Sequence, residues 1–357
     1  PQRGLGVTGQ DSVQAVPYRG RVFWLWGDTN LSYYPLGNFQ VTAATSPLPG
    51  SETLTPERGV ALEYFRDAKD NRRVRKMMPL DEPGAVWLFG LVNVKGPEGR
   101  ETLVAHYSRQ KQLGNVLEHG LAQFDGEAGV YRRIKQLPLA ESWRFPRGNA
   151  VKTFVDDDAY VYFCQPFANV RVRADWESIT NAKECEALAW SDEAKEYQWQ
   201  RDTPPTTQRE ECKLIADGKL PQAAARYQLR DAADDQKIVI HRASINWNPF
   251  RQRWIMIGNQ EGNAKSPSYL GEVYFAEAKA IDGPWTTAVK IATHPKYSFY
   301  NPRHHAFMDE DGGRVIYFEG TYTRMFSATK VPTPRYDYNQ LMYRLDLRNK
   351  RLTPARD

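Results

Sequence analysis

The chain has 357 residues, 41% of them hydrophobic and 25% charged, so it can fill a sizeable core in one large domain or two ordinary ones. Its net charge of +5 is spread along the sequence without a basic helix or nucleic-acid motif, and no run of about 18 apolar residues occurs, so we expect neither a nucleic-acid partner nor a membrane span. The three cysteines, Cys164, Cys185 and Cys212, lack CxxC spacing, which argues against a disulfide framework and against a zinc site.

Short segments enriched in aromatic and β-branched residues predict a succession of β-strands in five sets of four. The sets cover 11–17, 22–28, 39–45 and 59–66; 85–94, 101–108, 116–124 and 129–136; 148–155, 159–165, 168–174 and 185–190; 238–247, 253–259, 269–278 and 285–292; and 300–308, 314–319, 340–347 and 350–354. Four-strand units repeated in this way are typical of a β-propeller. We expect an all-β fold, a five-bladed propeller with four antiparallel strands per blade, as a single domain over 1–357. A pair of β-sandwiches is the competing architecture, and Pro204-Pro205 with the short helical stretches after it predicts a partly helical insertion near 203–235.

The predicted joints between strands differ in length on the two faces of such a ring. Joints between first and second strands are short and polar, whereas those between second and third strands, such as 29–38, 260–268 and 320–339, are long. The long joints carry Tyr33, Tyr34, Tyr269, Tyr322, Tyr336 and Tyr338. Function usually lies on the elaborated face, because loops there can vary on a rigid scaffold. That rim is predicted to collect Asp11, Asp28, Gln165, Glu261 and Glu319, with Arg147, Asn149, His241, Arg242, Tyr300, His304 and His305 nearby.

Two aspartates at the open end of the first predicted hairpin are the most informative residues. A turn at Arg19-Gly20 pairs Tyr18 with Arg21, and the same register sets Asp11 opposite Asp28. Residues opposed in this way have Cβ atoms roughly 5 Å apart, so the carboxylates repel and one pKa rises. Such pairs are typical of catalytic sites. The alternative is that a bulge shifts the register and both residues are ordinary turn aspartates.

The opening segment, Gly6-Val7-Thr8-Gly9-Gln10-Asp11-Ser12 followed by Phe23-Trp24-Leu25-Trp26-Gly27-Asp28-Thr29, resembles the first blade of five-bladed propeller glycoside hydrolases. It is most similar to the domain-of-unknown-function 4185 group and more distantly similar to glycoside hydrolase families 43 and 117. Looser matches include Tyr274-Phe275-Ala276-Glu277-Ala278 with Gly283-Pro284-Trp285, and Val315–Thr323. The resemblance implies a catalytic base at Asp11 or Asp28. Family 117 implies a histidine acid, which points to His304 or His305, while the second-blade aspartate segment of family 43 is absent here.

Glycoside hydrolysis needs an acidic and a basic group on either side of the scissile bond. Since both aspartates lie on one hairpin, we expect one to be the base and the other to raise its pKa, with Glu319 or His305 as the acid from across the funnel. Glu261 is a further candidate. Arginines at comparable strand mouths, Arg147, Arg242 and Arg303, could hold a carboxylate or sulfate.

The leading hypothesis is therefore a hydrolase that cleaves a poly- or oligosaccharide, an anionic one included. The alternatives are a polysaccharide lyase that uses His241, His305, Tyr300 and the arginines, and a non-catalytic carbohydrate-binding propeller. We expect no required cofactor, and leave open a structural metal ion in the central channel. The chain begins with Pro1 rather than Met, which indicates a removed signal peptide or an arbitrary boundary, and we expect a secreted or periplasmic protein.

Overall fold

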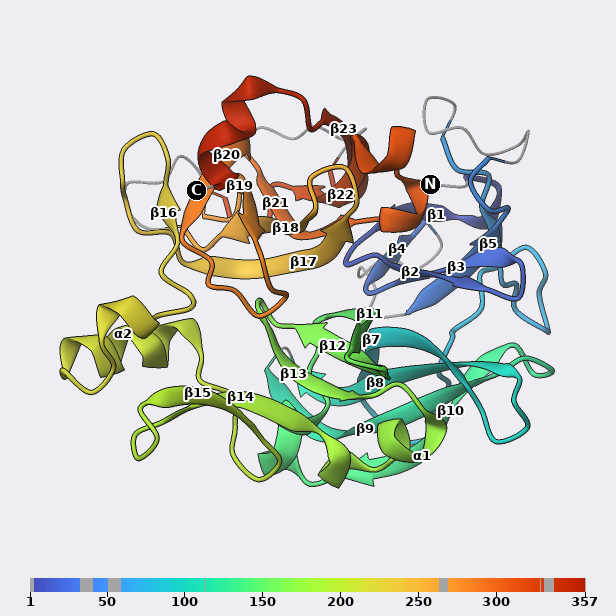
Figure 1. The fold of residues 1–357 in the computed structure, drawn as a ribbon. Helices are drawn as coiled ribbons and strands as arrows, with labels where there is room; N and C mark the ends of the chain where they lie inside the picture. Colours follow the sequence, from blue (N-terminus) through green and yellow to red (C-terminus); the bar gives the residue numbers. More distant parts are fainter. Residues whose placement is uncertain are drawn as a thin grey trace.

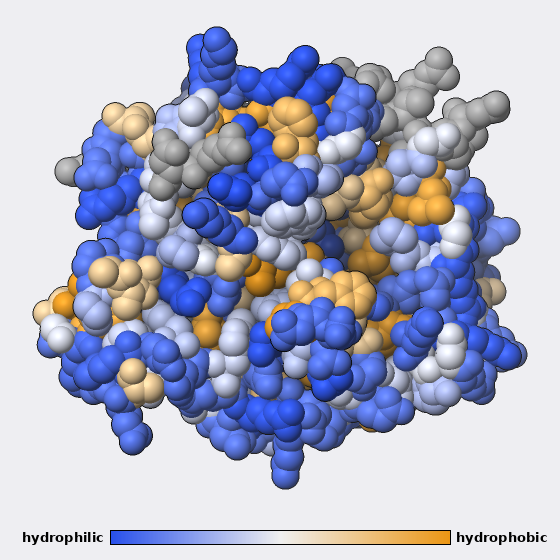
Figure 2. All heavy atoms as spheres, in the orientation of Figure 1, coloured by the Kyte–Doolittle hydropathy of each residue, from blue (hydrophilic) through white to orange (hydrophobic). Residues whose placement is uncertain are grey.

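The computed structural model describes residues 3–32, 41–50, 59–112, 114–262, 269–327, 329–330 and 337–356. Its five main sheets, numbered here as blades 1 to 5 in chain order, follow one another around the molecule. They run from the blue blade 1 through the green blades 2 and 3 to the yellow and red blades 4 and 5 (Figure 1). This arrangement confirms the predicted all-β, five-bladed propeller. The face in Figure 2 is mostly hydrophilic, and no helix in the described part of the chain is long and apolar enough to cross a membrane.

Blades 1 and 2 have the four antiparallel strands that the sequence predicts. Blade 1 contains β2 (Gln14–Tyr18), β3 (Arg21–Trp26), β5 (Thr42–Ser46) and β6 (Glu63–Tyr64). Blade 2 contains β7 (Ala85–Lys95), β8 (Glu101–Gln112), β9 (Asn115–Asp125) and β10 (Val130–Leu137), and η3 (Leu139–Arg144) leads out of it. The last strand of blade 1 is much shorter than the predicted 59–66, because the chain turns after Tyr64 into bridges rather than a continuous strand.

Blades 3 and 4 each carry one strand more than predicted. Blade 3 contains β11 (Asn149–Val155), β12 (Asp158–Cys164), β13 (Ala168–Arg173), β14 (Glu186–Ser191) and β15 (Glu196–Gln200), with α1 (Trp176–Thr180) and η4 (Ala182–Glu184) before β14. Blade 4 contains β17 (Ile240–Asn248), β18 (Arg253–Gln260), β19 (Val273–Ala278) and β20 (Thr287–Ala292), and β16 (Arg230–Asp231) pairs in parallel with β20. The predicted insertion is confirmed by α2 (Gln208–Ala216) and η5 (Gln222–Ala224), and a capping box of Thr207 and Glu210 begins α2.

Blade 5 departs from the prediction at its outer edge. It contains three strands, β21 (Ser298–His304), β22 (Val315–Thr323) and β23 (Asn339–Asp346). Two short helices, η6 (Ala306–Met308) and η7 (Asp311–Gly313), lie between β21 and β22. The fourth strand expected at 350–354 is wrong, since η8 (Lys350–Arg356) occupies this segment. Pro354 has no N–H for a strand ladder, and the Asn349 carbonyl accepts the Leu352 N–H to start a turn instead.

Five hydrophobic clusters alternate with the five blades and close the ring. Each cluster fills the interface of two neighbouring blades, as Phe23 and Val86 do between blades 1 and 2. The cluster between blades 5 and 1 joins the two ends of the chain, with Trp24 of β3 packed together with Tyr317 of β22. Every interface between neighbouring blades therefore has its own apolar core within the described residues, which is what a closed propeller requires.

The N-terminal segment adds polar contacts to this closure. After η1 (Arg3–Leu5), β1 (Val7–Gln10) pairs with β4 (Thr29–Leu31), and the Gln10 N–H donates to the Tyr338 carbonyl at 2.8 Å. The side chain of Gln340 in β23 donates to the Gln10 carbonyl at 3.2 Å. The first residues of the chain are therefore bound to its last blade. Of the predicted loop tyrosines, Tyr33, Tyr34 and Tyr336 lie outside the described residues.

We expect Leu352→Ala to lower the free energy of unfolding by about 2–4 kcal/mol, because Leu352 is 2% exposed in the cluster between blades 4 and 5. Urea denaturation measures this change. The neighbouring Arg351→Ala is the control: its side chain is exposed, and a shift beyond about 0.5 kcal/mol is not expected for such a residue. Equal stability of Leu352→Ala and the native chain would contradict the role assigned to η8.

Candidate active site

The predicted register of the first hairpin is confirmed. Tyr18 pairs with Arg21 around Arg19 and Gly20, whose φ values of 49° and 75° fit a type I′ turn. At the open end the Asp11 N–H donates to the Asp28 carbonyl at 3.0 Å. The two aspartates therefore lie opposite each other, as expected.

A close approach of side chain to backbone holds the pair together. The Asp28 N–H donates to Asp11 Oδ1 at 2.7 Å. A Cβ at Gly27 would lie 2.4 Å from the same oxygen, so a larger residue there would displace the Asp11 carboxylate from this hydrogen bond. Ser12 has a φ of 52°, so the backbone is irregular directly after Asp11, but Asp11 still lies opposite Asp28.

Side chains from other blades complete the surroundings of the pair. The Tyr300 hydroxyl of blade 5 donates to Asp11 Oδ2 at 2.7 Å, and Tyr338 also hydrogen-bonds to Asp11. The Trp87 indole N–H of blade 2 donates to Asp28 Oδ1 at 2.7 Å. Tyr300 is thus placed at the site as predicted, whereas Trp87 and Tyr338 were not among the predicted site residues. Trp87 lies near the start of the innermost strand of its blade, and this position in the sequence could have identified it as a site residue.

Burial and mutual repulsion shift the proton affinity of both carboxyls. Burial, and then the charge of Asp11, raise the pKa of Asp28 to about 8, and the indole N–H offsets this only in part. Burial also raises the pKa of Asp11, while hydrogen bonds from Tyr300 and from the Asp28 backbone act in the opposite direction. Because Asp11 has more donors, the geometry favours the shared proton on Asp28.

Three predicted arginines lie around the same ring but do not all converge. Arg147 and Arg242 are half-buried near the starts of β11 and β17. Arg303 is buried deeper, where it donates to Asn149 Oδ1 and to the Ala15 carbonyl. Asn149 is therefore a bridge inside the protein, since its amide also donates to the Ala243 carbonyl at 2.9 Å.

The predicted residues of blade 4 are divided between two environments. His241 is half-buried and its Nδ1 has no partner among the described residues. Burial, and then the charge of Arg242, lower the pKa of His241 to about 4, so its ring is neutral near pH 7. Glu261 directly follows β18 at the rim, where both its oxygens accept bonds from Arg209, at 2.6 and 2.7 Å. This contact to the insertion holds the pKa of Glu261 below its ordinary value.

Glu319, His304 and His305 lie inside the blade interfaces. The predicted strand end at Glu319 is wrong. Strand β22 continues to Thr323, and Glu319 pairs with Arg303 within it. Its Oε1 lies 2.6 Å from His305 Nε2, and the His305 ring packs against Trp24. His304 Nε2 lies 2.8 Å from Asp309 Oδ1. No described contact joins Glu319 or either histidine to the aspartate pair.

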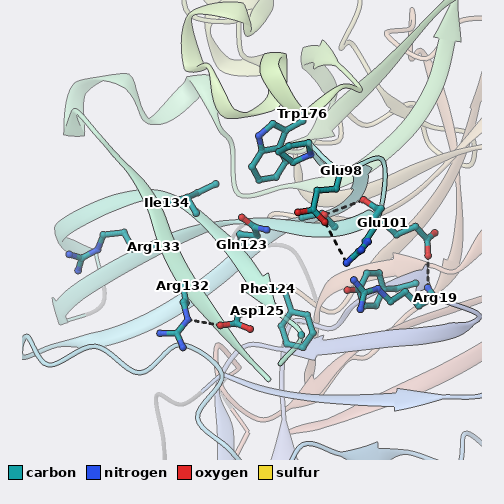
Figure 3. A pocket seen from close by; sticks show the side chains of 16 residues that line it. Arg19, Glu98, Glu101, Gln123, Phe124, Asp125, Arg132, Arg133, Ile134 and Trp176 are labelled. Atoms are coloured by element: carbon teal, nitrogen blue, oxygen red, sulfur yellow. Dashed lines mark hydrogen bonds and ion pairs between the residues drawn. The ribbon is translucent and has the colours of Figure 1, made fainter. Parts of the chain in front are cut away.

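A separate pocket of about 610 Å³ lies at the opposite end of the first hairpin, where Tyr18 and Arg19 line it together with residues of blade 2 and Trp176 (Figure 3). Its charged side chains are largely paired, as Arg132 is with Asp125 at 2.7 Å. We therefore place the candidate site at the aspartate pair. Among the described residues, no group of three or more His, Cys, Asp or Glu side chains could hold a metal ion.

The fold and the site together define a five-bladed β-propeller with a carboxylate pair at one end of its ring. No family model and no curated protein matches the chain. Solved structures with a similar arrangement include an exo-β-1,3-galactanase from Phanerochaete chrysosporium with β-1,3-galactotriose, at 10% identity and a TM-score of 0.47; the match covers 95% of this chain but only 64% of that protein.

Two further solved structures have similar values. A GH43_1 enzyme from Xanthomonas citri complexed with xylotriose has 9% identity, a TM-score of 0.46 and coverage of 95% of this chain and 88% of that one. An exo-1,5-α-L-arabinanase from a bovine ruminal metagenomic library has 11% identity, a TM-score of 0.46 and coverage of 95% and 94%. Values this low carry no argument about activity, and the resemblance to the domain-of-unknown-function 4185 group and to family 117 stays a prediction.

The raised pKa of Asp28 predicts a pH-dependent stability. The folded chain holds this proton more tightly than the unfolded chain, whose ordinary value is 3.8, so the free energy of unfolding should fall as pH rises from about 4 to about 8. We expect Asp28→Asn to reduce this slope, with a difference on the order of a few kcal/mol between pH 5 and pH 8.5. Urea denaturation at both pH values measures it. The exposed Asp157→Asn is the control, and an unchanged slope in Asp28→Asn would contradict the assignment.

Proposed function

We propose that this protein is a glycoside hydrolase that cleaves a poly- or oligosaccharide at the Asp11/Asp28 pair. The observation that carries the proposal is this pair itself: two opposed carboxyls, both with a raised pKa, held at one end of the ring by donors from other blades. Maintaining such a pair costs stability, and proteins retain that cost mainly where proton transfer is needed.

The two aspartates have different roles in this proposal. Both oxygens of Asp11 accept hydrogen bonds, so Asp11 is the positioning residue that raises the pKa of its neighbour. Asp28 has a pKa of about 8 and one described side-chain donor, so it is the group that transfers a proton. Deprotonated Asp28 acts as the general base that activates a water molecule.

The proton donor in this proposal is Glu319, with His305 as a positioning residue. The side chain of Glu319 keeps 8% of its surface exposed, whereas that of His305 keeps none. A group without exposed surface cannot touch a sugar, but His305 can orient Glu319 through their 2.6 Å contact.

A polysaccharide lyase is the second candidate. The observation in its favour is the neutral His241 beside Arg242 and Arg147, since β-elimination from a uronic acid needs a base and a cation that neutralises the carboxylate. An elimination yields an unsaturated sugar that absorbs in the near ultraviolet, whereas hydrolysis yields two saturated products. Absorbance and chromatography of the same reaction separate these two activities.

We expect Asp28→Asn to lower kcat by about 10²–10⁴-fold and Asp11→Asn to cause a similar loss, because the first removes the base and the second removes its activation. The assay is chromatography of products from neutral, uronic and sulfated glycans. Circular dichroism and the exposed Asp157→Asn variant control for folding. Activity near that of the native chain in both variants would contradict the proposal, and no product from any glycan would favour a non-catalytic binding propeller.

The assignment of Asp28 as base also predicts the direction of the pH profile. We expect kcat/KM to rise with pH up to about 8, because the base must be deprotonated in the free enzyme. The profile is measured with the best glycan from the panel between pH 5 and pH 10. A value of kcat/KM that falls from pH 7 to pH 9 would contradict the role as base and make Asp28 the proton donor.

A further inference from the structure

Arg147 and Arg242 come from different blades and lie together near the mouths of two innermost strands. Their segments are joined by the hydrogen bond from the Asn149 amide to the Ala243 carbonyl at 2.9 Å. Asn149 is two residues beyond Arg147, and Ala243 is the residue after Arg242. The two guanidinium groups are therefore close enough for the charge of Arg147 to lower the pKa of Arg242.

Neither guanidinium has an ion pair within the described part of the chain. Arg147 donates to Ser108 Oγ at 3.4 Å and lies over the Phe89 ring, 5.5 Å from its centroid. Arg242 donates to the carbonyl of the preceding residue at 3.0 Å. Both are half-buried, and burial lowers the pKa of each below its ordinary value. The buried Arg144 differs, since it pairs with Asp202 at 3.0 Å, whereas the buried Arg303 has neutral partners, Asn149 and the Ala15 carbonyl.

The acidic group that acts on Arg242, Glu261, already has another cation as its partner. Glu261 contributes to the environment of Arg242, but both its oxygens are bound by Arg209 and it also accepts from the Tyr269 hydroxyl. Two cations thus lie close together with their charges unbalanced, an arrangement that is costly unless an anion joins them.

Two polar side chains of blade 4 lie beside the arginines. They are His241 and Asn259, which interact with each other through a side-chain hydrogen bond, and Asn259 pairs with Arg242 across β17 and β18. Arginine forks suit carboxylate and sulfate oxygens, whereas Asn259 has no exposed surface and does not reach a ligand. The donors for an acidic group are therefore the two guanidinium groups themselves.

The arginines lie on the same rim as the aspartate pair. Trp87, which binds Asp28, and Phe89, which lies beneath Arg147, are two residues apart on β7 and so face the same side. Ser108, the partner of Arg147, is paired with Trp87 across the sheet.

We propose that Arg147 and Arg242 together bind the carboxylate or sulfate group of an acidic glycan while its glycosidic bond lies at Asp28. The proposal names the substrate class of the site and rests on the proposed function for the reaction, although the binding itself can be measured without turnover. Glycans without an acidic group leave the two charges uncompensated and bind more weakly.

The test is calorimetric titration of Asp28→Asn, which removes turnover, with three probes: trigalacturonate, a sulfated galactotriose and neutral galactotriose. We expect one of the acidic probes to bind at least about 10-fold more tightly than the neutral one, and the better probe identifies carboxylate or sulfate as the group. Arg147→Gln or Arg242→Gln on this background should weaken acidic binding by about 10- to 100-fold and leave neutral binding unchanged. Arg132→Gln, which lies in the separate pocket, is the matched control and should change nothing.

The outcomes separate this inference from the proposed function. Equal binding of all probes, no binding of the acidic ones, or acidic binding unaffected by both arginine substitutions overturns the inference, whether or not the native chain hydrolyses a neutral glycan. Binding of an acidic probe that depends on the arginines supports the inference, even where the native chain releases no product. The absence of product would overturn the proposed hydrolase and not the inference. Unchanged neutral binding and an unchanged Tm in the arginine variants show that the fold is intact.

Discussion

The interface that closes the ring between blades 5 and 1 holds both the fold and the aspartate pair in place. The apolar cluster around Trp24 and Tyr317 and the bond from Gln10 to the Tyr338 carbonyl join residues from opposite ends of the chain. The same closure carries Tyr300 to Asp11, 289 residues away in sequence. Without it the aspartate hairpin would lose its tyrosine donors and much of its burial, and so the cause of its raised pKa values. The stability of the fold and the chemistry of the site therefore share one interface.

The site combines two pairs of like charges, and each pair opposes folding. Repulsion and burial raise the pKa of Asp28, while burial and the charge of Arg147 lower the pKa of Arg242. Strand β7 lies between them, with Trp87 toward the carboxyls and Phe89 beneath the guanidinium. A packed scaffold can hold such groups because five apolar interfaces supply the favourable free energy elsewhere. The separation of acidic from basic groups gives the rim a polarity that suits a substrate with one charged end.

Local sequence predicted the features that depend on near neighbours. The Arg19-Gly20 turn set the register of the first hairpin and therefore the meeting of Asp11 with Asp28, because a two-residue turn leaves one pairing. Most strands of blades 1 to 4 were found because aromatic and β-branched residues cluster in them. The predictions are wrong where a segment's pairing partner determines its structure. The segment 350–354 is apolar enough for a strand, but Pro354 has no N–H to pair. The strand predicted to end at Glu319 continues, paired, to Thr323.

The amino-acid sequence predicts the class of fold, the first hairpin and the acidic and basic residues near the strand mouths. Which of these residues contact one another depends on how the blades pack together. Trp87 and Tyr338 join the aspartates, Arg147 joins Arg242, Arg303 turns inward to Asn149, and Glu319 pairs with His305. Hydrogen bonding and burial between blades follow from how five sheets close around one axis, which no local segment encodes. Spacing along a strand gives the face on which a side chain lies, but not the neighbour that the next blade places beside it.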